Sequence, residues 1–509
     1  MVLALAGCGG RSSLLEHLPS EGLDASGTGG SAMGGKGGTE SRGGTFSTGG
    51  KSGSAGTLNS AGTPNSAGAS AGAGQAGAPG MCSLAIGDCA TPNEPACKAS
   101  RSPCVGSIAS YELFKSDGYS VVNDVAASSD GRVAVTGYHF GDTYFGTHYY
   151  TTDASPDGRR QRAYVASFDA EPNVKWVYQD AVPEQSLGVS LAFAANGDAL
   201  IQTRHLAPST TGAGLLRLNA SGQELWRKDW GTSNVVPVAV AVDRNGRIWS
   251  SGNVYGQLGY PGGSLDAPTS QQGYLLQTED NGTWLQAFTI TPPTYQTTNV
   301  TDLQVDDEGS VIVIGSGDTV DLRFSSFLRK FSTSGEPAAH KNFDEALTLR
   351  SVVVDRSLRI SIVGSFKGTF VNEGTRFQAH PEDLFISQYS SDGELIWQKT
   401  YSGQLHATAA TVDAFGNLIV AGFGSKLVFD ARTLVSEHDT RTAAFVLKLR
   451  PNGSELWAQQ VDGGATFGGA ATDASGRIWL VGKLEASAWL GTDVLSSPSS
   501  YGLLVRLNP

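Results

Sequence analysis

The segment DAFGNLIVAG at residues 413–422 decides the fold of this chain, together with DLFISQYSSDGELIW at residues 383–397. The first segment contains an Asp-x-x-Gly turn and then an alternating apolar run that ends in Gly. The second contains an alternating run, a Gly turn and a run that carries Trp. Glycine between alternating runs is a strong hairpin signal, because such turns require a positive φ. Each segment therefore predicts a β-hairpin.

The two hairpins alternate along the chain with a period of about 50–65 residues, and four strands per period are typical of a β-propeller blade. The first hairpins of the copies occupy residues 121–137, 189–204, 238–252, 300–315, 349–364, 407–422 and 467–482. The last copy stops after its third strand, at residues 501–509, and residues 107–116 resemble the missing fourth strand. Since closing the ring removes free sheet edges, we predict an all-β, seven-bladed propeller over residues 107–509, closed by this N-terminal strand.

Three recurring residue types have structural explanations. The hairpin glycine is replaced in the fifth copy by Leu358, which predicts a strained or differently shaped turn there. The Trp residues of the fourth strands are expected to pack between blades. A recurring aspartate, expected to bond the backbone two residues on, occurs as Asp243, Asp306, Asp355, Asp413 and Asp473. Calcium binding is the alternative, but the dense run at 306–309 lacks the Glu that ends an EF-type loop.

The repeat resembles the bacterial β-propeller repeat family, of the exported or lipoprotein type. The two segments quoted first match its pattern best, and the second and fourth blades match it worst. The resemblance covers about 400 residues and implies the fold but no particular activity, because fold does not determine function.

The N-terminus resembles a lipoprotein signal. Leu5-Ala6-Gly7-Cys8 is similar to a bacterial lipobox, which makes Cys8 the expected lipidation site. The apolar run before Cys8 is short and has no basic start, so residues 1–8 represent either a truncated signal or a chance match, and we favour the former. Residues 9–81 are rich in Gly, Ser and Ala, which predicts a disordered tether.

Four further cysteines lie between the tether and the propeller, in a Cys-rich knot over residues 82–106. They are Cys82, Cys89, Cys97 and Cys104. In an exported chain this cluster predicts two disulfides, for which three pairings are open. A zinc site is the weaker alternative, because no Cys-x-x-Cys spacing occurs.

The net charge of −12 argues against nucleic acid or anionic lipid as a partner, since both require a basic surface. No apolar stretch reaches the roughly 20 residues of a transmembrane helix. We therefore expect an exported monomer that reaches the membrane only through its lipid, at the outer membrane or cell surface, with no cofactor or metal.

The face formed by the longer connections between strands is the expected binding surface, because recognition residues concentrate on variable loops of a rigid scaffold. Its most aromatic connection is YHFGDTYFGTHYYTT at residues 138–152. We expect Tyr138, His148, Tyr149 and Tyr150 to contact a surface polysaccharide or a protein ligand. Packing is the alternative for the aromatic residues of this segment, and one of Tyr144 or Phe145 is expected to pack.

These observations favour a non-catalytic binding or scaffold module. The alternative is a propeller enzyme, either a glycan-active hydrolase or lyase or a quinone-dependent dehydrogenase. Within the predicted propeller, no Gly-x-Ser-x-Gly or His-Glu-x-x-His motif supports catalysis. Recovery of a bound quinone would favour the dehydrogenase. A purely structural spacer is the third hypothesis.

Overall fold

The computed structural model describes residues 106–509 apart from short gaps. The gaps are 153–159, 183, 207–210, 232–233, 291–293, 344–345, 430–431, 436–442 and 491–492. Cys8, the tether and the four clustered cysteines lie outside the described residues. Every regular element in the described part is a strand, and no helix there is long and apolar enough to cross a membrane.

The strands form seven four-stranded antiparallel blades. Blade 1 contains β2 (Tyr119–Ala127), β3 (Val133–Phe140), β6 (Arg162–Phe168) and β7 (Val174–Gln179). Blade 2 contains β8 (Gln185–Phe193), β9 (Ala199–Leu206), β10 (Thr211–Leu218) and β11 (Glu224–Trp230). Blade 3 contains β12 (Asn234–Val242), β13 (Ile248–Tyr260), β14 (Gly263–Thr278) and β15 (Trp284–Ile290). Blade 4 contains β16 (Asn299–Val305), β17 (Val311–Asp318), β18 (Phe324–Phe331) and β19 (Pro337–Phe343).

The remaining three blades complete the ring. Blade 5 contains β20 (Leu347–Val354), β21 (Ile360–Asn372), β22 (Thr375–Tyr389) and β23 (Leu395–Tyr401). Blade 6 contains β24 (Leu405–Val412), β25 (Leu418–Gly424), β28 (Ala443–Leu449) and the first part of β29 (Glu455–Thr472). Blade 7 contains the rest of β29, β30 (Ile478–Leu490), β32 (Tyr501–Leu507) and β1 (Ile108–Ser116). Short additional strands are β4 (Thr143–Phe145), β5 (His148–Tyr150), β26 (Lys426–Phe429), β27 (Arg432–Val435) and β31 (Asp493–Leu495).

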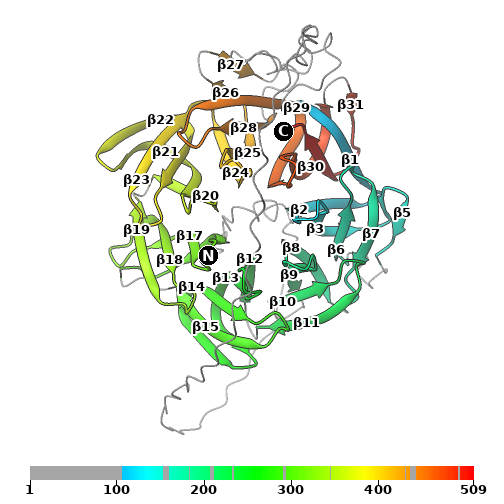
Figure 1. Cartoon of the computed structure of the whole chain (residues 1–509), viewed down its shortest axis with the longest axis horizontal. Coiled ribbons are helices and arrows are strands. Elements are labelled where there is room, and N and C mark those ends of the chain that lie inside the picture. Colours follow the sequence, from blue (N-terminus) through cyan, green and yellow to red (C-terminus); the bar gives the residue numbers. More distant parts are fainter. Residues whose placement is uncertain are drawn as a thin grey trace, which may run out of the picture. The chain divides into compact units, whose positions relative to one another are not determined.

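The ring is closed, as the sequence predicts. The innermost strands contact one another in the order β2, β8, β12, β16, β20, β24, β29 and back to β2, and the blades are arranged around a centre (Figure 1). The N-terminal strand β1 pairs antiparallel with β32, from Ile108 opposite Leu507 to Phe114 opposite Gly502. The edge of β32 is therefore covered by a strand from the other end of the chain.

The turn aspartates act on the backbone as expected. Asp413 Oδ1 accepts hydrogen bonds from the N–H groups of Phe415 and Asn417, both at 2.9 Å. Leu358, in the copy without the turn glycine, has a φ of 60° and the same closing bond, from its N–H to the Asp355 carbonyl at 2.9 Å. The turn therefore keeps its shape, and leucine takes the left-handed conformation that glycine occupies in the other copies.

The Trp residues of the outer strands join neighbouring blades, which confirms the packing prediction. The indole N–H of Trp176 donates to the Ala220 carbonyl of the next blade at 3.0 Å, and Trp397 does the same to Pro451 at 3.0 Å. A Cβ on the next blade's turn glycine, Gly222, would lie 2.6 Å from the Trp176 ring. Glycine is needed there for this close approach as well as for its φ of 83°.

Two buried aspartates connect the innermost strands. Asp124 Oδ2 accepts hydrogen bonds from the Ser190 hydroxyl at 3.0 Å and from the Leu191 N–H at 2.8 Å, both on the next blade. Asp302 makes the same pair of contacts with Ser351 and Val352, at 3.0 Å each. These bonds help to hold blade 1 to blade 2 and blade 4 to blade 5.

Candidate functional site

The connection at residues 138–152 contains a β-hairpin attached to the closing strand. Its strands β4 and β5 pair with each other, and β4 also pairs with β1 through Tyr144 opposite Lys115. Beneath the hairpin, the fully buried Phe145 ring lies 5.3 Å from Phe114 and 4.6 Å from Tyr164, measured between ring centroids. Because Phe114 belongs to β1, the hairpin covers the junction between blades 7 and 1.

Two tyrosine rings form the exposed face of this hairpin. Tyr144 and Tyr149 stand opposite each other in the register. Each has 51% of its surface exposed, and their ring centroids are 5.3 Å apart. A hydrogen bond with Asp142 raises the pKa of Tyr149, while hydrogen bonds with Thr151 and Tyr149 lower the pKa of Asp142. The result is an aromatic platform beside a carboxylate.

The other sequence-predicted residues lie deeper. Tyr138 is only 4% exposed and packs against Val121 and Leu187, and this burial raises its pKa. The half-buried Tyr150 donates its hydroxyl to the Val177 carbonyl at 2.9 Å. Half-buried His148 stands opposite Phe145, and its Nδ1 is buried without a hydrogen-bond partner among the described residues. Of the four predicted residues, only Tyr149 contributes to the exposed platform.

A buried histidine supports the hairpin from below. His139 is fully buried between Thr143, whose hydroxyl lies 2.9 Å from its Nδ1, and Gln179, whose amide nitrogen lies 3.2 Å from its Nε2. Burial lowers the pKa of His139 to about 4. The imidazole is therefore neutral at pH 7, and it fixes the base of the hairpin rather than presenting a charge to a ligand.

Tyr144 is the platform residue that the sequence did not assign to ligand contact. The signal that distinguishes it is the alternation within the hairpin, because neighbouring residues on a strand point to opposite faces. Once Phe145 is buried, Tyr144 and its cross-strand partner Tyr149 must point outwards. In the described part of the chain, no group of three His, Cys, Asp or Glu side chains is placed to hold a metal ion.

No family model and no curated protein sequence matches this chain. Similar solved structures include YCF48 bound to D1 peptide, at 9% identity and a TM-score of 0.40, covering 80% of this chain and 98% of that one. The β-propeller domain of the Trilobed protease from Pyrococcus furiosus has 9% identity and a TM-score of 0.39, covering 74% and 97%. A protein of unknown function from Dyadobacter fermentans has 10% identity and a TM-score of 0.39, covering 79% and 99%. Such identities carry no function over to this chain.

Proposed function

We propose that this chain is a cell-envelope lipoprotein whose β-propeller is a non-catalytic module that binds a surface polysaccharide. The platform of Tyr144 and Tyr149 is the observation that carries the proposal. Aromatic rings bury large areas when they pack, and the neighbouring Phe145 and Tyr138 do so. Tyr144 and Tyr149, which remain half exposed on the β4/β5 hairpin, are therefore available to a ligand.

The chemistry of the platform suits a sugar. The faces of aromatic rings carry partial negative charge and attract the slightly positive C–H groups of a pyranose ring. Asp142 lies next to the platform and is hydrogen-bonded to the Tyr149 hydroxyl, and both groups can supply polar partners for sugar hydroxyls. The hairpin is held by its pairing with β1 and by Phe145, and a preorganised site of this kind loses little entropy on binding.

The proposed attachment uses the part of the chain before the propeller. Lipidation of Cys8 would hold the protein at a membrane, and the Gly/Ser/Ala-rich tether at 9–81 would let the propeller reach outwards. The two proposed disulfides among Cys82, Cys89, Cys97 and Cys104 would stabilise the segment that leads into β1.

Binding can be tested by retention on isolated envelope polysaccharide and on intact cells. We expect the full chain to be retained and the Tyr144→Ala/Tyr149→Ala double variant to lose most retention. Tyr255→Ala is the matched control, because Tyr255 is also a tyrosine with 51% exposure but lies on blade 3. Equal retention of all three proteins would contradict the platform. Platform-dependent retention on cells but not on polysaccharide would indicate a protein ligand instead.

The anchor is tested separately by fractionating cells that express the gene from its own locus. We expect the wild-type protein in the membrane fraction and Cys8→Ser in the soluble fraction. An unchanged distribution of the Cys8→Ser protein would contradict lipidation at this residue without affecting the binding proposal.

A further inference from the structure

Arg329 departs from the repeat at a position where the other blades have no charge. In each blade, the third residue of the second strand pairs with one residue on the third strand. In blade 4 this pair is Val313 and Arg329. The equivalent residues are Ala166, Leu216, Leu276, Ser387, Leu447 and Val505. Five of these six residues are aliphatic, so blade 4 has a guanidinium where most of the other blades have a buried aliphatic side chain.

The guanidinium of Arg329 is buried among neutral groups. The residue is 8% exposed. Its Nη1 donates to the carbonyls of Leu328 and Lys341 at 2.8 and 2.9 Å, and its Nη2 donates to Asn342 Oδ1 at 2.7 Å. The carbon of the guanidinium lies 5.2 Å from the Phe327 ring centroid. Burial lowers the pKa of Arg329.

Neighbouring cations have acidic partners, whereas no carboxylate among the described residues forms an ion pair with Arg329. Lys330 pairs with Asp306 at 3.2 Å, and Lys341 pairs with Glu373. Burying a charge without a counter-charge costs free energy, and buried charges are normally paired. Replacing Arg329 by an aliphatic residue would remove this cost, so stability alone does not explain the arginine.

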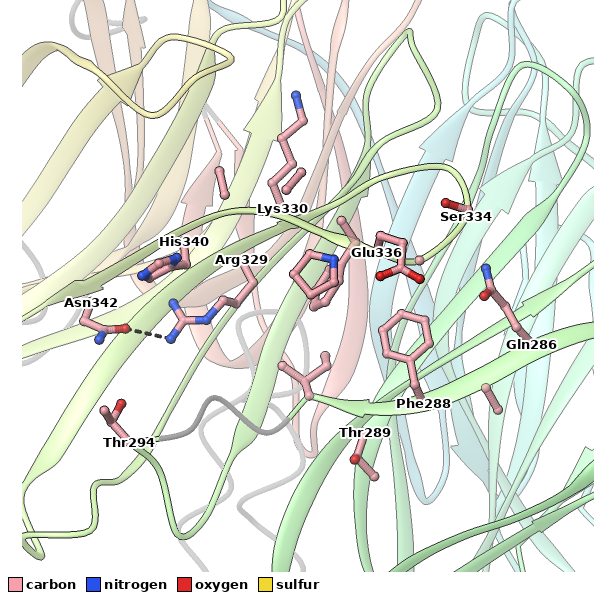
Figure 2. A pocket seen from close by; sticks show the side chains of 17 residues that line it. Gln286, Phe288, Thr289, Thr294, Arg329, Lys330, Ser334, Glu336, His340 and Asn342 are labelled. Carbon is pink, nitrogen blue, oxygen red and sulfur yellow. Dashed lines mark hydrogen bonds between the residues drawn. The ribbon is translucent and has the colours of Figure 1, made fainter. Parts of the chain in front are cut away.

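Arg329 lines a cleft of about 790 Å³ between the outer parts of blades 3 and 4. Figure 2 shows the side chain directed towards Asn342, with His340 and Phe288 also on the lining. The other walls include Ile290 and Pro337. Lys330, which is paired with Asp306, and the exposed Glu336 also line the cleft. Arg329 is therefore a buried cation that forms no ion pair with a described residue, and apolar side chains lie beside it.

We propose that this cleft binds an extended peptide and that Arg329 receives a carboxylate of that peptide. A planar guanidinium forms short, charge-assisted hydrogen bonds with a carboxylate. The protein carries a net charge of −12, and the exposed Glu336 lines the same cleft, so a polyanionic chain is disfavoured. A peptide with one carboxylate among apolar residues instead matches the one buried guanidinium and the apolar side chains beside it. This proposal is independent of the tyrosine platform.

A second cleft extends the surface available to such a peptide. It has a volume of about 830 Å³ and shares Thr294 and Asn342 with the first. Its lining includes Val320 and Phe324, which are 53% and 40% exposed. An extended chain held at Arg329 can therefore place apolar side chains against this neighbouring surface.

The test compares two small peptides that differ only in charge, N-acetyl-Ala-Phe and its C-terminal amide, by calorimetric titration of the full chain. We expect the free carboxylate to bind at least about tenfold more tightly than the amide, the usual size of a charge-assisted hydrogen bond. Arg329→Leu, which introduces the residue of blades 2, 3 and 6, should abolish the difference. Arg356→Leu, at an exposed position on blade 5, should preserve it.

Thermal melting of the variants separates a binding role from a structural one. We expect Arg329→Leu to melt at or above the wild-type temperature, because it removes a buried charge that forms no ion pair with a described residue. Equal affinity for both peptides, or no binding of either, would overturn the proposal. Binding of polygalacturonate that is lost in Arg329→Leu, with no response to the peptides, would overturn the peptide in favour of an acidic polysaccharide.

Discussion

Replacing Asp124 by asparagine is expected to weaken the junction between blades 1 and 2. Asp124 is fully buried, its Oδ1 accepts from the Val125 N–H at 2.8 Å, and its Oδ2 accepts from Ser190 and Leu191 across the junction. Asparagine keeps the shape of the side chain but replaces one accepting oxygen with a donating NH₂ group. In either orientation of the amide, at least one buried backbone N–H therefore faces a donor.

The expected loss follows from these bonds. One buried N–H without an acceptor costs about 1–3 kcal/mol, and weakening the remaining charge-assisted bonds adds about 1 kcal/mol. We therefore expect a loss of about 3 kcal/mol. A ring of about 400 residues has an unfolding entropy of about 0.8 kcal/mol/K, at about 2.1 cal/mol/K per residue. The melting temperature should consequently fall by about 3–4 °C.

The assay is calorimetric melting at pH 7 of wild-type protein, Asp124→Asn, Asp302→Asn and the double variant. Asp302 makes the equivalent bonds, so the melting temperature of Asp302→Asn should fall by a similar amount. The melting temperature of the double variant should fall by the sum of the two single decreases, because the two sites are on different blades and well separated. Asp392→Asn, on an exposed turn, is the control. A change in Asp124→Asn no larger than in the control would refute the assigned role of these bonds.

Three further predictions concern ring closure, acid stability and turn geometry. Phe114→Ala should lower the free energy of unfolding by about 3–5 kcal/mol, because Phe114 on β1 is fully buried. Limited proteolysis should also cleave β1 of this variant faster than β1 of the wild type. An unchanged melting temperature and cleavage rate would contradict this. Burial raises the pKa of Glu382, but hydrogen bonds from His406 and Ser365 outweigh it and lower the pKa to about 2, so its stabilisation is present above the unfolded pKa near 4.5 and lost as the pH falls towards 2. The full shift corresponds to about 3 kcal/mol, which solvent screening of this partly exposed carboxylate reduces, so Glu382→Gln should be less stable at pH 7 by about 2 kcal/mol. It should also lose less stability between pH 5 and 3, and parallel pH curves in urea unfolding would rule this out. Leu358→Gly should change the free energy of unfolding by less than about 1 kcal/mol, because relief of the strained left-handed backbone offsets the greater entropy that glycine loses on folding. A larger loss of stability in urea titration would contradict this, because it would mean that packing of the leucine side chain contributes more than the strain costs.

The architecture of the propeller was predictable because its signals are local. Strand alternation, the turn aspartates and the hairpin glycines act within a few residues, so each blade could be recognised from its own segment. The closure by residues 107–116 followed from counting strands, since the last copy lacked one. The turn at Leu358 was predicted to be strained or altered. It has the expected positive φ with an unchanged turn, because the Asp355 bonds determine its shape.

The candidate sites depended on contacts between distant parts of the chain. Tyr144 faces solvent because the pairing of β4 with β1 buries the opposite face of the hairpin. Tyr138, on β3, is buried instead by its packing against Val121 and Leu187. Arg329 looks unremarkable in the sequence. Its significance required the register that aligns it with aliphatic residues in other blades. It also required the cleft between two blades, where Arg329 forms no ion pair with a described residue. Local sequence therefore determined the blades, whereas exposure and charge balance were decided by which blades and strands meet in space.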